Sequence, residues 1–379
     1  MAQTPHRVPD PARYARHIAL AEVGAAGQQR LADSSVLVVG AGGLGSPAAL
    51  YLAAAGVGTI GLADHDRVEI SNLQRQVLFA TDEIGQGKAV TARARLTGLN
   101  PSLNVIAHAE KLVAGNVARM FRDYDVIIDG TDRLATRYLI NDACVMLGKP
   151  LVSAAIHRFE GQAMTYVPGS SPCYRCLYPE SPEDLVPNCA TAGVLGVLPG
   201  VMGSIQATEA LKLLLGIGET LAGRLLVYDA LSLTFDEFRF ARRTDCAVCG
   251  AHPTITSLAQ HEEPVLSQIE EWSPQQLAAE LKKDGEERLF MVDVREPHEW
   301  EAGRLPGSVH IPLGTLPARM GEIPADVTPV FICAAGGRSM RAAQLFVQAR
   351  GHEAINLGGG VMGWSQVYGA PPQPDEHRH

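Results

Sequence analysis

The sequence is poor in cysteine, carries no excess of positive charge and has no long apolar run. Seven cysteines in 379 residues are too few for a disulfide scaffold and indicate metal ligands or reactive thiols. A formal net charge of −9 argues against nucleic-acid or anionic-membrane partners, because both need clustered cations. No stretch approaches the roughly 20 apolar residues that span a bilayer, and the first residues lack the apolar core of a secretion signal. We therefore expect a cytoplasmic protein.

The length of the chain predicts two domains. In the first, short β-branched runs alternate with helical stretches, which indicates an α/β fold with a largely parallel, doubly wound sheet. We assign this domain to residues 1–250. Its predicted strands are 35–39, 59–63, 105–107 and 126–129, and its clearest predicted helices are 46–55 and 202–215.

Beyond Cys249 the sequence becomes polar, with prolines at Pro253 and Pro264, and we interpret residues 251–272 as a linker. Ser273-Pro-Gln-Gln then offers a capping hydroxyl, a proline at the first helical position and a glutamine at the third, which predicts a helix start. A smaller α/β domain is expected over residues 273–370, followed by a disordered tail over 371–379. Its predicted elements are strands 289–294, 330–333 and 354–357 and helix 339–350.

A glycine-rich loop stands between the first predicted strand and helix, with glycines at positions Gly40, Gly42, Gly43 and Gly45. Glycines let backbone N–H groups approach a phosphate, and the helix N-terminus adds partial positive charge. Asp64 ends the next strand, where a carboxylate can accept a hydrogen bond from a ribose hydroxyl. Alone, this motif also fits nicotinamide and flavin enzymes.

Polar residues after Asp64 separate these possibilities: Ser71, Asn72, Arg75 and Lys88 follow it, and Asp132 and Arg133 come after the strand at 126–129. A redox site does not need such cations. A nucleotidyl-transfer site does, because negative charge builds on the α-phosphate and the leaving pyrophosphate. The carboxylate of Asp132 stands where Mg²⁺ can be held.

These motifs, in order over roughly residues 10–250, resemble the MoeB/ThiF family of adenylyltransferases, bacterial relatives of ubiquitin-activating enzymes. The resemblance implies a Rossmann-like domain that uses ATP and Mg²⁺ to adenylate the C-terminal Gly-Gly carboxylate of a small ubiquitin-like sulfur carrier. It further implies that Asp64 binds ribose, that Asn72, Arg75 and Lys88 bind phosphates, and that Arg16 acts across a homodimer interface. Arg133 departs from the family, where asparagine is commoner.

Two CxxC pairs, Cys173/Cys176 and Cys246/Cys249, have the pattern of a tetrahedral Cys₄ zinc site. Their wide separation suits a structural Zn²⁺ that joins a distant segment to the domain. A redox CxxC is the alternative, although no thioredoxin-like context surrounds either pair. The family resemblance supports zinc.

Two other cysteines are candidate reactive thiols. Cys189 lies among small residues after a proline, and in the MoeB/ThiF family a matching cysteine can form a transient covalent bond; a buried, inert cysteine is the alternative. Cys333 ends an apolar strand just before Ala334-Ala335-Gly336-Gly337-Arg338 and a helix. Backbone N–H groups and the helix dipole then favour negative charge on the sulfur, and Arg338 adds positive charge nearby.

The segment around Cys333, over about Ser273–Tyr368, resembles rhodanese, whose six-residue loop begins with the nucleophile. Two upstream stretches, 292–300 and 303–312, resemble the flanking signatures of that family, and we expect Asp293 and Arg295 to form an ion pair. Ala334 stands where a basic residue is common, which argues against free thiosulfate as the preferred sulfur donor.

The combination resembles the MoeZ-type adenylyltransferase/sulfurtransferases. It implies that a persulfide on Cys333 displaces AMP from the adenylated carrier to give a thiocarboxylate, for molybdopterin, thiamine or cysteine synthesis or tRNA thiolation. A cysteine desulfurase or thiosulfate is the expected sulfur source. Two alternatives remain open: a nicotinamide oxidoreductase with an appended regulatory module, and a non-catalytic scaffold that binds a ubiquitin-like protein.

Overall fold

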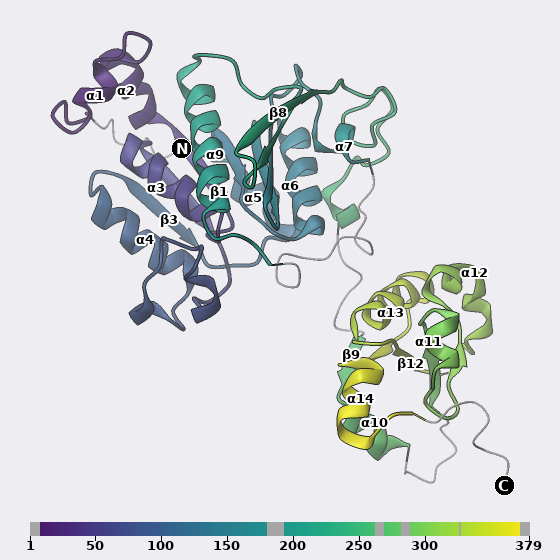
Figure 1. The fold of residues 1–379 in the computed structure, drawn as a ribbon. Coiled ribbons are helices and arrows are strands. Elements are labelled where there is room, and N and C mark those ends of the chain that lie inside the picture. Colours follow the sequence, from purple (N-terminus) through teal and green to yellow (C-terminus); the bar gives the residue numbers. More distant parts are fainter. Residues whose placement is uncertain (1–7, 180–192, 262–268, 282–288, 326, 372–379) are drawn as a thin grey trace, which may run out of the picture. The chain divides into compact units, whose positions relative to one another are not determined.

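The computed structural model describes residues 8–179, 193–261, 269–281, 289–325 and 327–371. The chain divides into two compact units, residues 1–261 and 262–379, shown in Figure 1. Cys189 and most of the predicted tail lie outside the described residues. No helix in the described ranges is long and apolar enough to cross a membrane.

The larger unit is built on an eight-stranded sheet with the order β3-β2-β1-β4-β5-β6-β7-β8. The first five of these strands in space are parallel, and β6, β7 and β8 extend the sheet in antiparallel fashion. Chain order reverses between β1 and β4, so the crevice at their carboxyl ends is the place where such sheets bind ligands. The strands are β1 Ser35–Val39, β2 Thr59–Ala63, β3 Asn104–His108, β4 Val126–Asp129, β5 Leu151–His157, β6 Glu160–Tyr166, β7 Arg224–Asp229 and β8 Thr234–Arg239.

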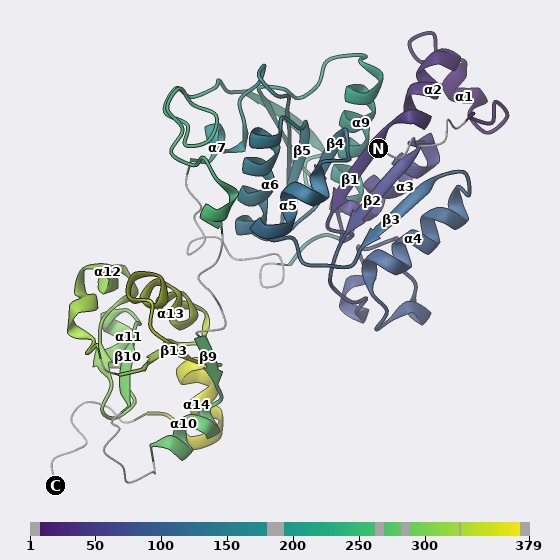
Figure 2. The same cartoon turned by 180° about the vertical axis from the view of Figure 1, so that it is seen from behind.

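Helices cover both faces of this sheet (Figures 1 and 2). Successive side chains of β1 alternate between the faces, as a strand requires. Val36 and Val38 pack with α3 and α9, whereas Leu37 and Val39 pack with α5 and α6. Both sets are apolar, which is why the strand is a continuous apolar run. The helices are α1 Ala15–Ile18, α2 Gly24–Asp33, α3 Gly45–Ala55, α4 Lys88–Leu99, α5 Ala114–Phe121, α6 Leu134–Leu147, α7 Tyr174–Leu177 and α9 Leu198–Leu215, with 3₁₀ turns η1 Ile70–Asn72, η2 Thr81–Glu83 and η3 Leu258–His261.

The smaller unit holds a parallel five-stranded sheet with the order β11-β10-β12-β13-β9. The predicted helix start at Ser273 is confirmed, because its hydroxyl accepts a hydrogen bond from the backbone N–H of Gln276. The elements are β9 Ile269–Trp272, α10 Pro274–Glu280, β10 Phe290–Asp293, α11 Pro297–Glu301, β11 Val309–His310, α12 Leu316–Arg319, β12 Pro329–Ile332, α13 Gly337–Arg350, β13 Ala354–Leu357 and α14 Gly360–Tyr368, with 3₁₀ turns at Leu313–Thr315 and Met320–Glu322.

The segment that we interpreted as a linker is structured at both ends. Ile255 and Leu258 pack on the core beneath α5 and α6, and His261 lies 2.7 Å from the buried carboxylate of Asp142. At the other end, β9 pairs with β13. Residues 262–268, between these ends, are outside the described part of the chain. The α/β class and the parallel-rich central sheet are as predicted.

Candidate active sites and metal centre

The glycine loop joins β1 to α3 at the switch point of the larger sheet. Gly40 has a φ of +88°, and a Cβ there would lie 2.9 Å from the carbonyl oxygen of Gly130 after β4. Only glycine therefore fits where the loops after β1 and β4 touch. Gly45 begins α3, so the N-terminus of α3 faces this crevice. Phosphate sites commonly use such a helix N-terminus.

Asp64 follows β2 and holds the glycine loop in place. Its Oδ2 accepts a hydrogen bond from the backbone N–H of Ala41 at 2.8 Å, and its Oδ1 accepts one from that of Asp66 at 2.9 Å. Each carboxylate oxygen keeps a second acceptor site, so a further hydroxyl can bind. Potential metal-ligand atoms of three consecutive side chains, those of Asp64, His65 and Asp66, lie within 4.8 Å of one another.

The polar segment from Ser71 onward lies against the glycine loop. A Cβ on Gly42 would be 3.7 Å from Nε2 of Gln76, and one on Gly43 would be 3.6 Å from Cγ of Arg75. Arg75 donates to the carbonyl of Ser71 at 3.0 Å. The structure therefore brings this segment and the glycines together.

Three residues of this crevice, Lys88, Asn72 and Gln76, have buried polar side chains. The ammonium of Lys88, the first residue of α4, lies 3.2 Å from Oδ2 of Asp66. Oδ1 of Asn72 and Oε1 of Gln76 have no hydrogen-bond partner within the described residues. A buried acceptor without a donor is costly, and such groups mark places where a ligand or ion supplies the missing partner.

The loop after β4 separates a structural carboxylate from an accessible one. Asp129 is fully buried and is held by Arg137 at 3.1 Å and by the hydroxyl of Ser153 at 2.9 Å. Asp132 and Arg133 are exposed, and Arg133 directly precedes α6. Of the two aspartates, Asp132 is thus the one that faces solvent beside the glycine loop.

Arg16 is not brought to the glycine loop of its own chain. It is exposed on α1, where the neighbouring Tyr14 packs on Gly56, directly after the C-terminal end of α3. The loop lies at the other end of this 11-residue helix, which is about 16 Å long.

Four buried cysteines form a compact cluster. The Sγ atoms are 4.0 Å apart between Cys173 and Cys176, 3.7 Å between Cys173 and Cys246, and 3.4 Å between Cys176 and Cys249. Four sulfurs at the zinc–sulfur bond length of about 2.3 Å in a tetrahedron are about 3.8 Å apart. Arg243 also donates its backbone N–H to Sγ of Cys176 at 3.4 Å. The cluster fits one metal ion.

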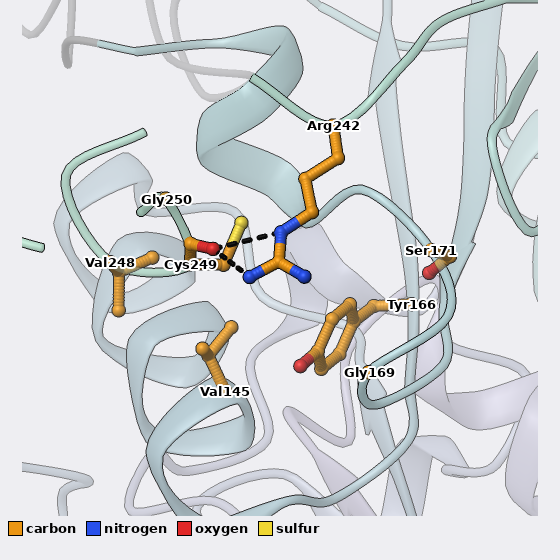
Figure 3. Close-up of a pocket in the computed structure, with 8 residues that line it drawn as sticks. All are labelled: Val145, Tyr166, Gly169, Ser171, Arg242, Val248, Cys249 and Gly250. Carbon is orange, nitrogen blue, oxygen red and sulfur yellow. Dashed lines mark hydrogen bonds between the residues drawn. The ribbon is translucent and has the colours of Figure 1, made fainter. Parts of the chain in front are cut away.

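A pocket of about 260 Å³ lies beside this cluster (Figure 3). Arg242 enters it and donates to the carbonyl of Cys249, with Nε at 2.8 Å, which ties the second CxxC turn to the chain entering it. Burial raises the pKa of Tyr166, in its wall, to about 12. The pocket also borders Val145, in the last turn of α6, whereas Arg133 of the crevice precedes the first turn of that helix. The pocket therefore lies at the opposite end of α6 from the crevice, and we assign it to the metal centre.

In the smaller unit, Cys333 follows β12 at the start of the loop to α13. Its sulfur is buried and accepts hydrogen bonds from the backbone N–H of Gly336 at 3.1 Å and from the hydroxyl of Ser339 at 3.3 Å. Gly336 adopts a φ of +97°, which turns its N–H towards the sulfur. Donors already aimed at sulfur stabilise negative charge on it.

Arg338, expected to add positive charge beside Cys333, also forms an ion pair with Glu299. Its guanidinium donates two hydrogen bonds to Glu299, at 2.6 and 2.7 Å. The Arg338 guanidinium lowers the pKa of Glu299 to about 2. The predicted ion pair between Asp293 and Arg295 is confirmed at 2.7 Å, with both side chains buried.

Comparison with known proteins identifies both units. The model of the ThiF family matches residues 14–248, and that of the rhodanese-like domain matches residues 273–367. The chain is 42% identical to the probable adenylyltransferase/sulfurtransferase MoeZ of Mycobacterium tuberculosis, over 96% of this chain and 94% of that protein. The chain belongs to the ThiF family, in the branch that is fused to a rhodanese-like domain. The predicted enzyme class, adenylyltransferase and sulfurtransferase, is confirmed.

Two further similarities concern the ThiF unit. A sulfur carrier protein adenylyltransferase of Thermus thermophilus is 51% identical over 66% of this chain and 94% of its own length. The crystal structure of MccB from E. coli superimposes with a TM-score of 0.57 at 22% identity, covering 64% of this chain and 75% of that chain, which shows a shared fold.

Sequence reasoning missed several residues of these sites. Asp66 and Gln76 were not predicted as site residues, although Asp66 lies two positions after Asp64 and Gln76 directly follows Arg75. Glu299 lies inside the upstream rhodanese signature, but its contact with Arg338 spans 39 positions and has no local signal. Ser339 was assigned to the helix alone, whereas its hydroxyl reaches Cys333.

Proposed function

We propose that this enzyme adenylates the C-terminal glycine of a small ubiquitin-like sulfur carrier with ATP and Mg²⁺, and then converts it to a thiocarboxylate with sulfur from Cys333. The observation that carries the proposal is the convergence of the polar segment after Asp64 on the glycine loop. Support also comes from the relatives, one of which is named for a sulfur carrier protein.

In the crevice, the proposed roles follow from position and charge. Backbone N–H groups of the loop Gly40–Gly45 cradle phosphate, and Asp64 accepts from a ribose hydroxyl. The proposed phosphate ligands are Ser71, Asn72, Arg75, Lys88 and Arg133. Asp132 is the proposed ligand of Mg²⁺, which would screen the phosphate charge during attack by the carrier carboxylate.

Arg16 requires a second copy of the chain. Since it lies at the end of α3 away from the glycine loop, it can act on phosphate only in the active site of a partner subunit. We therefore propose a homodimer in which each protomer supplies Arg16 to the other.

Zn²⁺ is the proposed occupant of the cysteine cluster, because four thiolates that leave no open coordination position form a structural zinc site.

The reaction proceeds in three displacements. The carrier carboxylate attacks the α-phosphate of ATP, and pyrophosphate leaves to give an acyl-adenylate. The terminal sulfur of a Cys333 persulfide then attacks the carbonyl carbon, and AMP leaves with the carbon–oxygen bonding pair. A thiolate, for which we propose Cys189, finally attacks the Cys333 sulfur of the acyl disulfide and releases the carrier thiocarboxylate, which leaves a Cys189–Cys333 disulfide that an external thiol reductant must reduce.

The edge of the larger sheet offers a surface for the carrier. Leu231, Leu233, Phe235 and Phe238 are all more than half exposed, on β8 and the turn before it. β8 is the last strand of the sheet, so its outer backbone groups are unpaired with any other strand in the described structure. Apolar side chains on an open strand suit a β-rich protein that adds to the sheet.

Exchange of pyrophosphate into ATP tests the adenylation half. Carrier proteins ending in Gly-Gly should support exchange by the wild-type enzyme, and Asp132→Asn should abolish it. Cys333→Ala should leave exchange unchanged, because the sulfur enters only after adenylation. A lack of exchange with every carrier would refute the proposed function.

A further inference from the structure

Arg338 closes the loop that begins with Cys333, and its charge is not free. Both terminal nitrogens of its guanidinium contact Glu299, at 2.6 and 2.7 Å, in a two-pronged ion pair. The side chains are only 33% and 24% exposed, so the pair is shielded from solvent more than an ordinary surface pair.

Glu299 is itself fixed in position. It is the third residue of α11, and its Oε2 accepts a hydrogen bond from the backbone N–H of Glu296 at 2.9 Å, which closes a capping box. Turning away from Arg338 would also break this cap. The Glu299 carboxylate is therefore held beside the loop by two contacts, the ion pair with Arg338 and the helix cap.

Arg295 and Glu296, the two charged residues directly before α11, add no free positive charge. Arg295 is held by the fully buried Asp293, and Glu296 adds a further carboxylate on the side of Arg338. Ala334 and Ala335, which follow Cys333, carry no charge. Together, these described groups comprise two cations and three carboxylates, so a small dianion finds no unpaired cation among them.

We propose that Glu299 is a specificity-determining residue, which neutralises Arg338 and thereby makes Cys333 accept sulfur from thiol persulfides in preference to thiosulfate. This rests on the proposed sulfur transfer and specifies its donor. With a thiol persulfide, the Cys333 thiolate attacks the terminal sulfur, and the donor thiolate leaves with the sulfur–sulfur bonding pair. With thiosulfate, the same attack releases sulfite, and the dianion must first approach the loop.

The test compares two donors with one acceptor. The full-length enzyme receives sulfur from thiosulfate or from the persulfide of 2-mercaptoethanol, a donor without carboxylates, and passes it to cyanide, which leaves as thiocyanate. Glu299→Gln keeps the size and the capping acceptor but removes the charge. We expect kcat/KM for thiosulfate to rise about tenfold, mainly through a lower KM, because a freed guanidinium binds anions in a two-pronged fashion. The kcat/KM for the persulfide donor should change less than about twofold.

The controls separate charge from folding. Glu301→Gln, exposed on the same helix, should leave both donors unaffected, and Glu299→Asp, which keeps the charge, should retain the wild-type preference. The gain in Glu299→Gln should vanish when Arg338→Ala is added. An unchanged donor ratio in Glu299→Gln, or a gain that persists without Arg338, would overturn the proposal. Failure of the wild-type enzyme with both donors would instead refute the proposed sulfur transfer.

Discussion

The ammonium of Lys88 lies 3.2 Å from the carboxylate of Asp66, and joins the start of α4 to the loop after β2. The lysine side chain is 7% exposed and the aspartate side chain 55% exposed, so a buried cation rests on a partner at the open side of the crevice. In the proposed phosphate site, a phosphate would bind the ammonium where Asp66 already holds it.

Replacement of Lys88 by methionine should therefore remove adenylation and spare the fold. We expect carrier-dependent pyrophosphate exchange to fall about 10²- to 10³-fold, as when one preorganised donor to a developing charge is lost. Sulfur transfer to cyanide should be unchanged. Lys111→Met, at an exposed position, is the matched control, and equal exchange rates in the two variants would contradict the assignment.

Removal of metal should destabilise only the larger unit. All three tryptophans of the chain, Trp272, Trp300 and Trp364, lie in the smaller unit, so their fluorescence reports its unfolding alone. A chelator, or Cys249→Ser, should lower the midpoint temperature of the unfolding transition followed by far-ultraviolet circular dichroism by about 10 °C. The reason is that the free energy of metal binding contributes to the free energy of folding.

The midpoint temperature of the unfolding transition followed by tryptophan fluorescence should not change under the same treatment. Cys144→Ala changes a buried cysteine outside the cluster and should leave the zinc content of the purified protein unaltered. A preparation that holds no zinc and keeps its full stability would argue against a structural site.

A charge on the sheet edge should weaken binding of the carrier. Phe238 is 58% exposed on β8, and Phe238→Asp should raise the KM for the carrier about tenfold while the maximal exchange rate persists. Val113→Asp, at an exposed position before α5, serves as control. Equal KM values for both variants would place carrier binding elsewhere.

The pair of Glu299 and Arg338 should make the smaller unit sensitive to acid. Arg338 lowers the pKa of Glu299 from its ordinary 4.5 to about 2, so the stabilisation is complete above pH 4.5 and is lost as the pH falls towards 2. Partial exposure limits the effect to about 1 kcal/mol. Urea unfolding followed by tryptophan fluorescence should show this loss in the wild-type protein and a smaller one in Glu299→Gln. Identical pH dependence in both proteins would show that the pair contributes nothing.

Much of this architecture follows from local sequence. The apolar run Ser35–Val39, the glycines after it and the capping signal at Ser273 each determine a structure within a few residues, and all appear where they were expected. The paired cysteines indicate their cluster because ligand spacing is itself a local signal.

The remainder depends on contacts between distant residues. The antiparallel strands β6 to β8 were not predicted, and the exposed β8 lacks the alternating apolar pattern that marks a strand. The pairing of Glu299 with Arg338 arises only when α11 and the loop after β12 meet. The docking of His261 on Asp142 likewise crosses 119 positions, which is why a polar stretch looked like a free linker.

In the proposed reaction, a carboxyl group activated by AMP in the larger unit receives sulfur from Cys333. The most direct measurement is the mass of the carrier C-terminus after incubation with ATP, Mg²⁺ and a persulfide donor. We expect a thiocarboxylate with the wild-type enzyme, and with Cys333→Ala an adenylated carrier without sulfur. A thiocarboxylate formed by Cys333→Ala at the wild-type rate, or one formed without ATP, would contradict it.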